Sequence, residues 1–255
     1  MKKLLSAFSL YVLVSHAANA PLKVGMELAY PPFEMTDKSG KPDGISVGIA
    51  NALGEYLKKP IKIENMSFDG LIPALKTGSI DLVISSLTVN DERKKSIDFS
   101  SPYVKTGLAL LVGKDTKIQN EMDLKKLGAK VAVKKGTTAH AWATKNLSSD
   151  KIIVLDKEAT AVLEVVQKKA DAFIYDQMSV YKHWIKNRET TRALLKAFQQ
   201  EAWAIGVRKG NSNLLNAVNS FVNDFRAKKG FDNLGSKYLG AEKQVFKELG
   251  VDFIL

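Results

Sequence analysis

Cysteine is absent from the 255 residues of this chain. Its absence excludes disulfides, thiolate nucleophiles, Cys-ligated zinc and a cysteine-linked lipid anchor. Histidine is scarce as well, because only His140 and His183 lie beyond the N-terminal segment. No H-E-x-x-H zinc motif, P-loop or G-x-G-x-x-G fingerprint is present. We therefore expect no catalytic residues of these classes, no metal and no cofactor.

Long apolar runs are also absent after the N-terminus, where no segment approaches the ~18 residues that a membrane-spanning helix needs. At the N-terminus, two lysines precede the apolar run Leu4–Val14, and Ala18–Ala20 forms a small-x-small cleavage site. This pattern predicts a signal peptide over residues 1–20. Pro21 disfavours cleavage directly before it, so a cut after Ser15–Ala17 stays an alternative. Export without an anchor predicts a periplasmic protein.

Positive charge exceeds negative charge, with a formal net charge of +11 that falls to +9 without Lys2 and Lys3. Such an excess could indicate binding to nucleic acid or to an anionic membrane surface. The basic residues are scattered, however, and short clusters such as Arg93–Lys95 do not form a stripe. We therefore interpret them as solvated surface residues and expect no nucleic-acid partner.

Hydrophobic periodicity predicts an α/β protein in which sheets are flanked by helices. The expected strands are Leu22–Met26, Ile61–Ile63, Asp81–Ser85, Leu108–Val112, Lys130–Val133, Ile152–Leu155, Ala172–Tyr175 and Trp203–Val207. The expected helices are Ile45–Leu57, Phe68–Lys76, Met122–Leu127, Thr138–Asn146, Ala159–Lys168, Gln177–Lys186 and one around Leu214–Phe225, followed by two segments on either side of Gly240.

The length suits two α/β units of about a hundred residues each. No linker-like composition separates them, so the boundaries are expected in extended segments near Val104–Leu108 and Gln200–Ala204. The first lobe would then be discontinuous, with residues 21–106 and 204–255, and the second lobe would comprise residues 107–203. The chain would cross between the lobes twice.

Polar side chains follow several of the predicted strands, where open α/β sheets bind their ligands. They are Glu27 and Tyr30, then Ser85, Ser86, Thr88 and Arg93, then Thr137 and Thr138, and finally Asp176. Each one alone is weak evidence, because a Ser or Thr before a helix is more often a cap than a ligand contact, and an Asp after a strand is also commonly a cap. Four strand ends drawn from both predicted lobes indicate a shared ligand site.

Several motifs along the mature chain resemble the periplasmic polar-amino-acid-binding proteins of ABC transporters, the family 3 extracellular solute-binding proteins. The matching segments are Tyr30–Glu34, Phe68–Leu75, Asp81–Lys95, Asp98–Tyr103, Gly136–Thr138, Ala170–Ala172 and Asp176. The family usually carries an acidic residue where Gly48 stands in this chain, on a predicted helix away from the ligand. The resemblance implies a two-lobed fold that closes about two hinge strands.

The resemblance also implies roles for individual residues. Arg93 would grip the ligand α-carboxylate, a task that suits a planar guanidinium, and Asp176 would bind the α-ammonium group. Ser86 and Thr88 would supply backbone and hydroxyl contacts, and Thr138, at the start of a helix, would present N–H groups to the carboxylate. Ser85 and Thr137 complete the predicted ligand-binding set. The rings of Tyr30 and Phe68 would enclose the ligand side chain, whose far end would meet Glu27 and, from the other lobe, Lys134.

Ligand preference depends on the residues at that far end. Glu27 alone would favour a basic amino acid, whereas Glu27 together with Lys134 would suit an amide such as that of glutamine. An acidic ligand is disfavoured. The expected partners are a free amino acid and a membrane permease, with a monomeric protein. Two alternatives stay open: an enzyme on the same fold, such as a cyclohexadienyl dehydratase, with Glu27 or Lys134 as acid or base, and a sensory protein that presents its closed form to a receptor.

Overall fold

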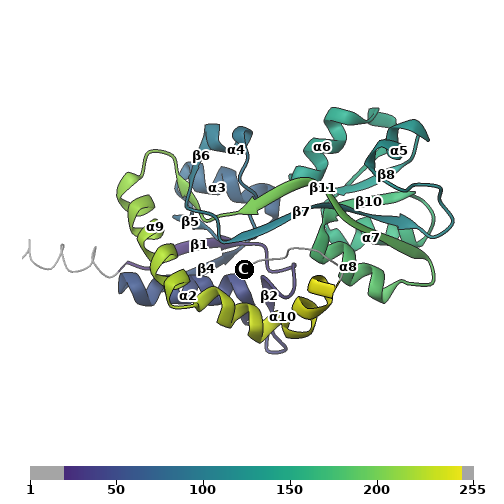
Figure 1. The fold of residues 1–255 in the computed structure, drawn as a ribbon. Coiled ribbons are helices and arrows are strands. Elements are labelled where there is room, and N and C mark those ends of the chain that lie inside the picture. Colours follow the sequence, from purple (N-terminus) through teal and green to yellow (C-terminus); the bar gives the residue numbers. More distant parts are fainter. Residues whose placement is uncertain (1–19, 249–255) are drawn as a thin grey trace, which may run out of the picture.

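The computed structural model describes residues 20–248, which form two α/β lobes side by side (Figure 1). The sheet of the first lobe has five strands in the order β4-β1-β5-β12-β6. β1 pairs in parallel with both neighbours, whereas β12 pairs antiparallel with β5 and β6. The bounds are β1 Leu22–Met26, β4 Ile61–Asn65, β5 Leu82–Val83, β6 Ile97–Phe99 and β12 Gly206–Arg208.

Helices cover both faces of this first sheet (Figure 1). They are α2 Ile45–Leu57, the 3-10 turn η1 Phe68–Gly70, α3 Leu71–Thr77, α4 Asp91–Ser96, α9 Ser212–Ala227 and α10 Gly230–Glu248. Each face has its own buried core, one on the side of α3 and one on the side of α2, α9 and α10. Gly48 of α2 lies against Leu234 of α10, where an added Cβ would come within 2.6 Å of the leucine side chain. Close helix packing thus accounts for a glycine at this position.

The second lobe contains another five-stranded sheet, in the order β11-β7-β10-β8-β9. Its strands are β7 Val104–Gly113, β8 Val131–Lys134, β9 Ile152–Leu155, β10 Ala172–Asp176 and β11 Thr191–Trp203. Its helical elements are α5 Glu121–Lys126, α6 Thr138–Asn146, η2 Ser149–Lys151, α7 Glu158–Val166 and α8 Gln177–Lys186. Two separate cores again cover the two faces. The predicted α/β fold with two lobes is confirmed.

The antiparallel ribbon of β7 and β11 runs between the two lobes (Figure 1). Val104 pairs with Trp203 at its first-lobe end, and Trp203 also forms an isolated bridge with Thr88. The chain therefore passes from one sheet to the other twice, before β7 and after β11. The predicted domain boundaries, at residues 106/107 and 203/204, fall within and at the end of this ribbon and stay a prediction.

Several element predictions need correction. The strand predicted over Trp203–Val207 is split, because β11 ends at Trp203 and β12 begins at Gly206. The two helical segments predicted around Gly240 form one helix, α10. The strand predicted over Asp81–Ser85 is reduced to β5, and the loop before α2 contains the small hairpin β2 Met35–Thr36 and β3 Pro42–Asp43.

The predicted signal peptide lies almost entirely outside the described residues, which begin at Ala20. Its cleavage site therefore stays a prediction. Within residues 20–248, no helix is both long and apolar enough to cross a bilayer.

Candidate functional site

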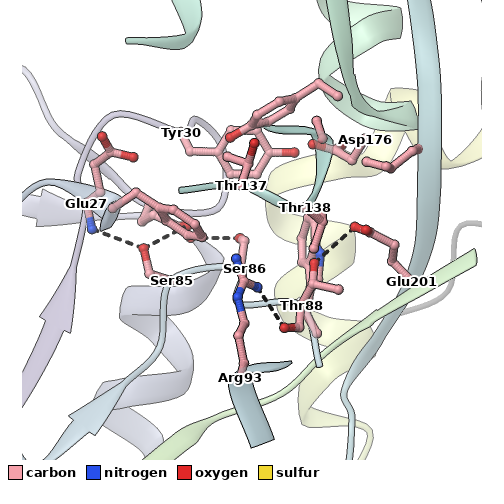
Figure 2. A pocket seen from close by; sticks show the side chains of 16 residues that line it. Glu27, Tyr30, Ser85, Ser86, Thr88, Arg93, Thr137, Thr138, Asp176 and Glu201 are labelled. Atoms are coloured by element: carbon pink, nitrogen blue, oxygen red, sulfur yellow. Dashed lines mark hydrogen bonds between the residues drawn. The ribbon is translucent and has the colours of Figure 1, made fainter. Parts of the chain in front are cut away.

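A cavity lies between the lobes, and residues of both lobes line it (Figure 2). Ten of the eleven predicted site residues are in its wall: Glu27, Tyr30, Phe68, Ser85, Ser86, Thr88, Arg93, Thr137, Thr138 and Asp176. The eleventh, Lys134, binds Glu27 from the second lobe. The structure therefore brings the predicted residues together, while their contacts with a ligand stay a prediction.

Arg93 lies on the short helix α4 and reaches across the cleft. Its Nη1 donates to the Thr88 carbonyl oxygen at 2.7 Å, and its Nη2 donates to the Gly136 carbonyl oxygen of the second lobe at 3.1 Å. Burial lowers its pKa to about 10, against the opposing effect of the Glu201 charge, so the guanidinium stays protonated at neutral pH. Its remaining N–H groups suit a carboxylate, which accepts two parallel hydrogen bonds.

Asp176 provides the opposite charge from the second lobe, where it is 5% exposed at the end of β10. Its Oδ1 accepts the backbone N–H groups of Met178 at 3.0 Å and Ser179 at 3.1 Å, and thereby caps α8. Burial and then the nearby charge of Glu158 raise the pKa of Asp176 to about 7. A ligand cation beside this carboxylate would lower that pKa again and favour the charged form.

Glu27 and Lys134, here called the far-end pair, join the lobes at another part of the cavity wall. Lys134 is 2% exposed, and its Nζ hydrogen-bonds the Glu27 carboxylate. The same ammonium lies 5.4 Å from the centroid of the Phe68 ring, and the guanidinium carbon of Arg93 lies 5.6 Å from it. Phe68 therefore has two cations in the range of a cation–π contact.

Ser85 and Ser86 follow β5 and are held by a buried carboxyl that the sequence reasoning missed. Glu34 is 2% exposed and accepts hydroxyl groups from Ser46 at 2.5 Å, Ser86 at 3.2 Å and Ser85 at 3.3 Å. Burial raises the pKa of Glu34 to about 8 against these hydrogen bonds. The Ser85 hydroxyl also accepts the Glu27 N–H at 3.0 Å. This network fixes the turn after β5.

Thr137 and Thr138 lie where α6 begins, directly after the second-lobe loop at Gly136. The Thr137 hydroxyl accepts the His140 N–H at 3.2 Å and donates to the Lys134 carbonyl oxygen at 2.7 Å. Thr137 is thus the N-cap of α6. The first N–H groups of a helix have no partner within the helix and favour negative charge, so this end of α6 suits the same carboxylate as Arg93.

An aromatic cluster surrounds Tyr30 at the cavity wall. The Tyr30 ring stacks on Phe33 at 5.4 Å between centroids and meets Tyr175 and Trp203 edge-on at 5.9 and 6.0 Å. Burial and then the charge of Asp176 raise the pKa of Tyr30 well above its ordinary value, so its hydroxyl stays protonated. Together with Phe68, this cluster gives the cavity apolar surface for a ligand side chain.

Six lining residues were not predicted: Glu34, Leu108, Ala139, Tyr175, Glu201 and Trp203. Glu34 ends the motif that begins at Tyr30, and Tyr175 directly precedes Asp176, so their position beside predicted residues was the available signal. Glu201 falls inside the predicted crossover segment, but no sequence pattern marks it as part of the site.

The segment Gly44–Gly48 matches G-x-S-x-G, the pattern of a hydrolase nucleophile elbow. Its serine, Ser46, is fully buried in the first turn of α2, and its hydroxyl donates to Glu34. A nucleophile of that class must be exposed and paired with a base. The segment therefore provides no catalytic serine.

The sequence model of one protein family, the bacterial extracellular solute-binding proteins of family 3, matches residues 22–241 of this chain. The chain belongs to this family. The family assignment agrees with the predicted resemblance and covers both lobes and the whole cavity wall.

Relatives within the family are named as amino-acid-binding proteins. The L-arginine-binding protein of Pseudomonas aeruginosa is 33% identical over 252 residues, covering 93% of this chain and 96% of that protein. The L-cystine-binding protein TcyJ of Escherichia coli K12 is 32% identical over 223 residues, covering 87% of this chain and 83% of that protein. An ancestral amino acid-binding protein, described as a precursor of cyclohexadienyl dehydratase, has a TM-score of 0.77 and 35% identity, covering 89% of this chain and 97% of that chain. Amino-acid binding is thus the function that these family 3 relatives share.

Proposed function

We propose that this protein is an extracytoplasmic solute-binding protein, which captures a free amino acid between its lobes and delivers it to an ABC transporter permease. The observation that carries the proposal is the meeting of opposite charges in one cavity, Arg93 from the first lobe and Asp176 from the second. A zwitterionic head group complements both. Its contacts with both lobes exist only when the lobes are closed, so binding favours the closed state.

The far-end pair supports a neutral ligand side chain with a dipolar end, such as an amide, over a basic one. A cationic side chain could use Glu27 only by displacing Lys134, which is almost fully buried. Removing one partner of a buried ion pair leaves an uncompensated charge, which costs about 3–5 kcal/mol. An amide can instead donate to the carboxylate and accept from the ammonium group. We therefore place glutamine ahead of arginine.

A thermal-shift screen with the twenty amino acids, ornithine, citrulline and cystine tests the function. A ligand that binds only the folded protein raises the melting temperature, with about 2.7 kcal/mol of stabilisation at a concentration of 100 Kd. We expect glutamine to give a larger shift than arginine. A screen in which no amino acid raises the melting temperature would reject the proposed function, whereas a shift with arginine alone would reject only the side-chain preference.

Lys134→Met tests the side-chain preference directly. Methionine keeps the apolar stem and removes the ammonium group, so Glu27 becomes free to pair with a ligand cation. We expect arginine to gain affinity relative to glutamine in titration calorimetry. Lys135→Met, which changes the neighbouring and half-exposed lysine, is the matched control. It should leave the ratio of arginine affinity to glutamine affinity unchanged.

We also propose that the chain is not an enzyme, although a dehydratase precursor is among its structural relatives. Curated relatives are named as binding proteins, and Glu27 and Lys134 neutralise each other instead of facing a substrate as free acid and base. Incubation with prephenate or arogenate should give no aromatic product by absorbance. Product formation that Glu27→Gln abolishes would overturn this part of the proposal.

A further inference from the structure

A further carboxylate, that of Glu201, lies in the cavity wall and has no role in the proposed grip on the head group. Glu201 is 8% exposed and lies on β11, where it pairs with Thr106 of β7. Its Oε2 accepts the Thr88 hydroxyl at 3.0 Å, and its Oε1 accepts the Gln199 amide at 3.2 Å. None of the ion pairs formed by residues 20–248 includes it. Glu201 therefore brings a nearly buried negative charge that no neighbouring cation cancels at contact distance.

Thr88 connects this carboxylate to the guanidinium group. Its hydroxyl donates to Glu201, and its carbonyl oxygen accepts Nη1 of Arg93 at 2.7 Å. Figure 2 shows the two charged side chains approaching Thr88 from different sides of the cavity. The charge of Glu201 raises the pKa of Arg93 against the effect of burial. Any anion that binds Arg93 therefore lies within the field of Glu201 as well.

The charges of the closed cavity do not balance. The two charges of the far-end pair cancel each other. Glu34, whose pKa is about 8, is mostly neutral at pH 7. Arg93 then faces two acidic residues, Asp176 and Glu201. An amino-acid head group brings one negative and one positive charge, and its ammonium group favours the ionised form of Asp176, so the bound complex carries this negative excess in full. The excess acts on whatever charge the ligand side chain carries.

We propose that Glu201 is a specificity-determining residue that selects against ligands with an anionic side chain. The inference rests on the proposed function, since it concerns which amino acids the same cavity accepts. A fixed charge of the same sign as a competitor is an effective way to exclude it, because a buried like charge disfavours the wrong ligand without contacting the right one. Glutamate and glutamine have nearly the same shape, so shape alone cannot separate them.

Glu201→Gln tests this inference with glutamine, glutamate and arginine as ligands. The amide oxygen can still accept the Thr88 hydroxyl, so the variant mainly removes charge. In titration calorimetry near neutral pH, we expect glutamate affinity to rise about tenfold, in line with the ~1.4 kcal/mol that a like-charge interaction across a protein cavity can carry. Glutamine affinity should change by less than about threefold and arginine affinity should fall, by the same electrostatic argument. The change in affinity that Glu201→Gln causes should therefore depend on the net charge of the ligand.

The controls separate this role from a structural one. A loss of affinity by the same factor for all ligands would mean that Glu201 only holds Thr88 in place, and the inference would be wrong. It would also be wrong if glutamate binding stayed unmeasurable in a variant that binds glutamine normally. Glu55→Gln, which removes the same charge from the exposed face of α2, should change none of the affinities. A wild-type protein that binds no amino acid at all would instead reject the proposed function itself.

Discussion

The two halves of the cleft hold their charged groups in different ways. In the first lobe, the side chain of Arg93 takes no part in capping its own helix, because Asn90 caps α4. In the second lobe, the carboxylate of Asp176 both faces the cavity and caps α8. The first charge therefore has no part in forming its own helix, whereas the second belongs both to a helix cap and to the site.

Burial also affects the two charges differently. It lowers the pKa of Arg93 only to about 10, far above neutral pH, but it raises the pKa of Asp176 to about 7. The anion-binding half of the site is thus always charged, while the cation-binding half titrates in the physiological range. Binding should therefore be pH-dependent through the ammonium-binding group of the second lobe, while in the first lobe the pKa of Glu34, about 8, lies in the same range.

Replacing Arg93 should have the largest effect on binding. Truncating one partner of a buried, charge-assisted contact costs about 2–5 kcal/mol, so Arg93→Ala should weaken the proposed amino-acid complex about 30-fold or more. The melting temperature without ligand should fall less than the affinity, because the side chain caps no helix but donates to the Thr88 and Gly136 carbonyl oxygens. Arg93→Lys keeps the charge but not the planar pair of donors and should recover only part of the affinity. Near-wild-type calorimetric affinity for Arg93→Ala would remove this residue from the site.

Asp176→Asn should separate binding from stability within the second lobe. Asparagine caps helices about as well as aspartate, so α8 keeps its cap. The amide lacks the negative charge for an ammonium group, and affinity should fall by about tenfold or more. Denaturant titration near pH 8 should find the variant at least as stable as the wild type. A clear loss of stability in Asp176→Asn would show that the cap needs the charge.

The pH dependence has a definite sign. Folding raises the pKa of Asp176 from its ordinary value of about 3.9 to about 7. Protonation below pH 7 therefore opposes ammonium binding, and affinity should fall by up to about tenfold per pH unit there. The ionised group costs folding free energy, so its contribution to stability worsens as pH rises from about 4 to 7. Asp176→Asn should remove the share of both profiles that Asp176 contributes, while Glu34, whose pKa is about 8, continues to titrate. A wild-type affinity that does not change between pH 5 and 8 would contradict this prediction.

Gly136→Ala should impair closure. Gly136 has φ +76°, and an added Cβ would lie 2.9 Å from the Cβ and 3.1 Å from the Cα of Asp69 in the first lobe. We expect about a tenfold loss of affinity, equivalent to ~1.4 kcal/mol, and a larger radius of gyration with saturating ligand by X-ray scattering. Gly210→Ala is the matched control, because Gly210 has φ +79° but no atom within 4 Å of the added Cβ. Equal effects of both variants would assign the loss to backbone strain.

The Lys135–Asp69 ion pair should contribute least. It joins the lobes at 2.9 Å, but its side chains are 53% and 33% exposed. Exposed pairs are worth about 0–1 kcal/mol, so Lys135→Gln should lower affinity less than about fivefold. The difference from wild type should shrink further at high salt, because exposed charges are screened. A larger effect that persists in high salt would mean that the pair is part of the site.

Local sequence patterns predicted helices and strands well where buried apolar residues recur at the regular spacing of that element. The apolar positions of Ile45–Leu57 recur at helical spacing, and α2 has the predicted bounds. β11 was largely missed, since Thr191–Trp203 has few fully buried residues and its register shifts between Leu194 and Gln199. Gly240 was interpreted as a helix break, yet open space surrounds it, and α10 continues through it.

The site was predictable to the extent that its residues follow strands or belong to the family motifs. Arg93 and Asp176 meet both conditions, and both line the cavity. Glu34 and Glu201 could not be recognised as buried carboxyls, because their hydrogen-bond partners include Ser85 and Thr88, which lie 51 and 113 positions away. Only the packed fold shows that such groups lie beside the ligand cavity.

The guanidinium of Arg93 has a kinetic consequence. It donates to the Gly136 carbonyl oxygen of the opposite lobe, so the group proposed to hold the ligand also fastens the lobes together. Separation of the lobes must break that bond, and the same movement withdraws one wall from the bound molecule. The ligand would then leave only after the lobes open, so its residence time would be at least as long as the lifetime of the closed protein.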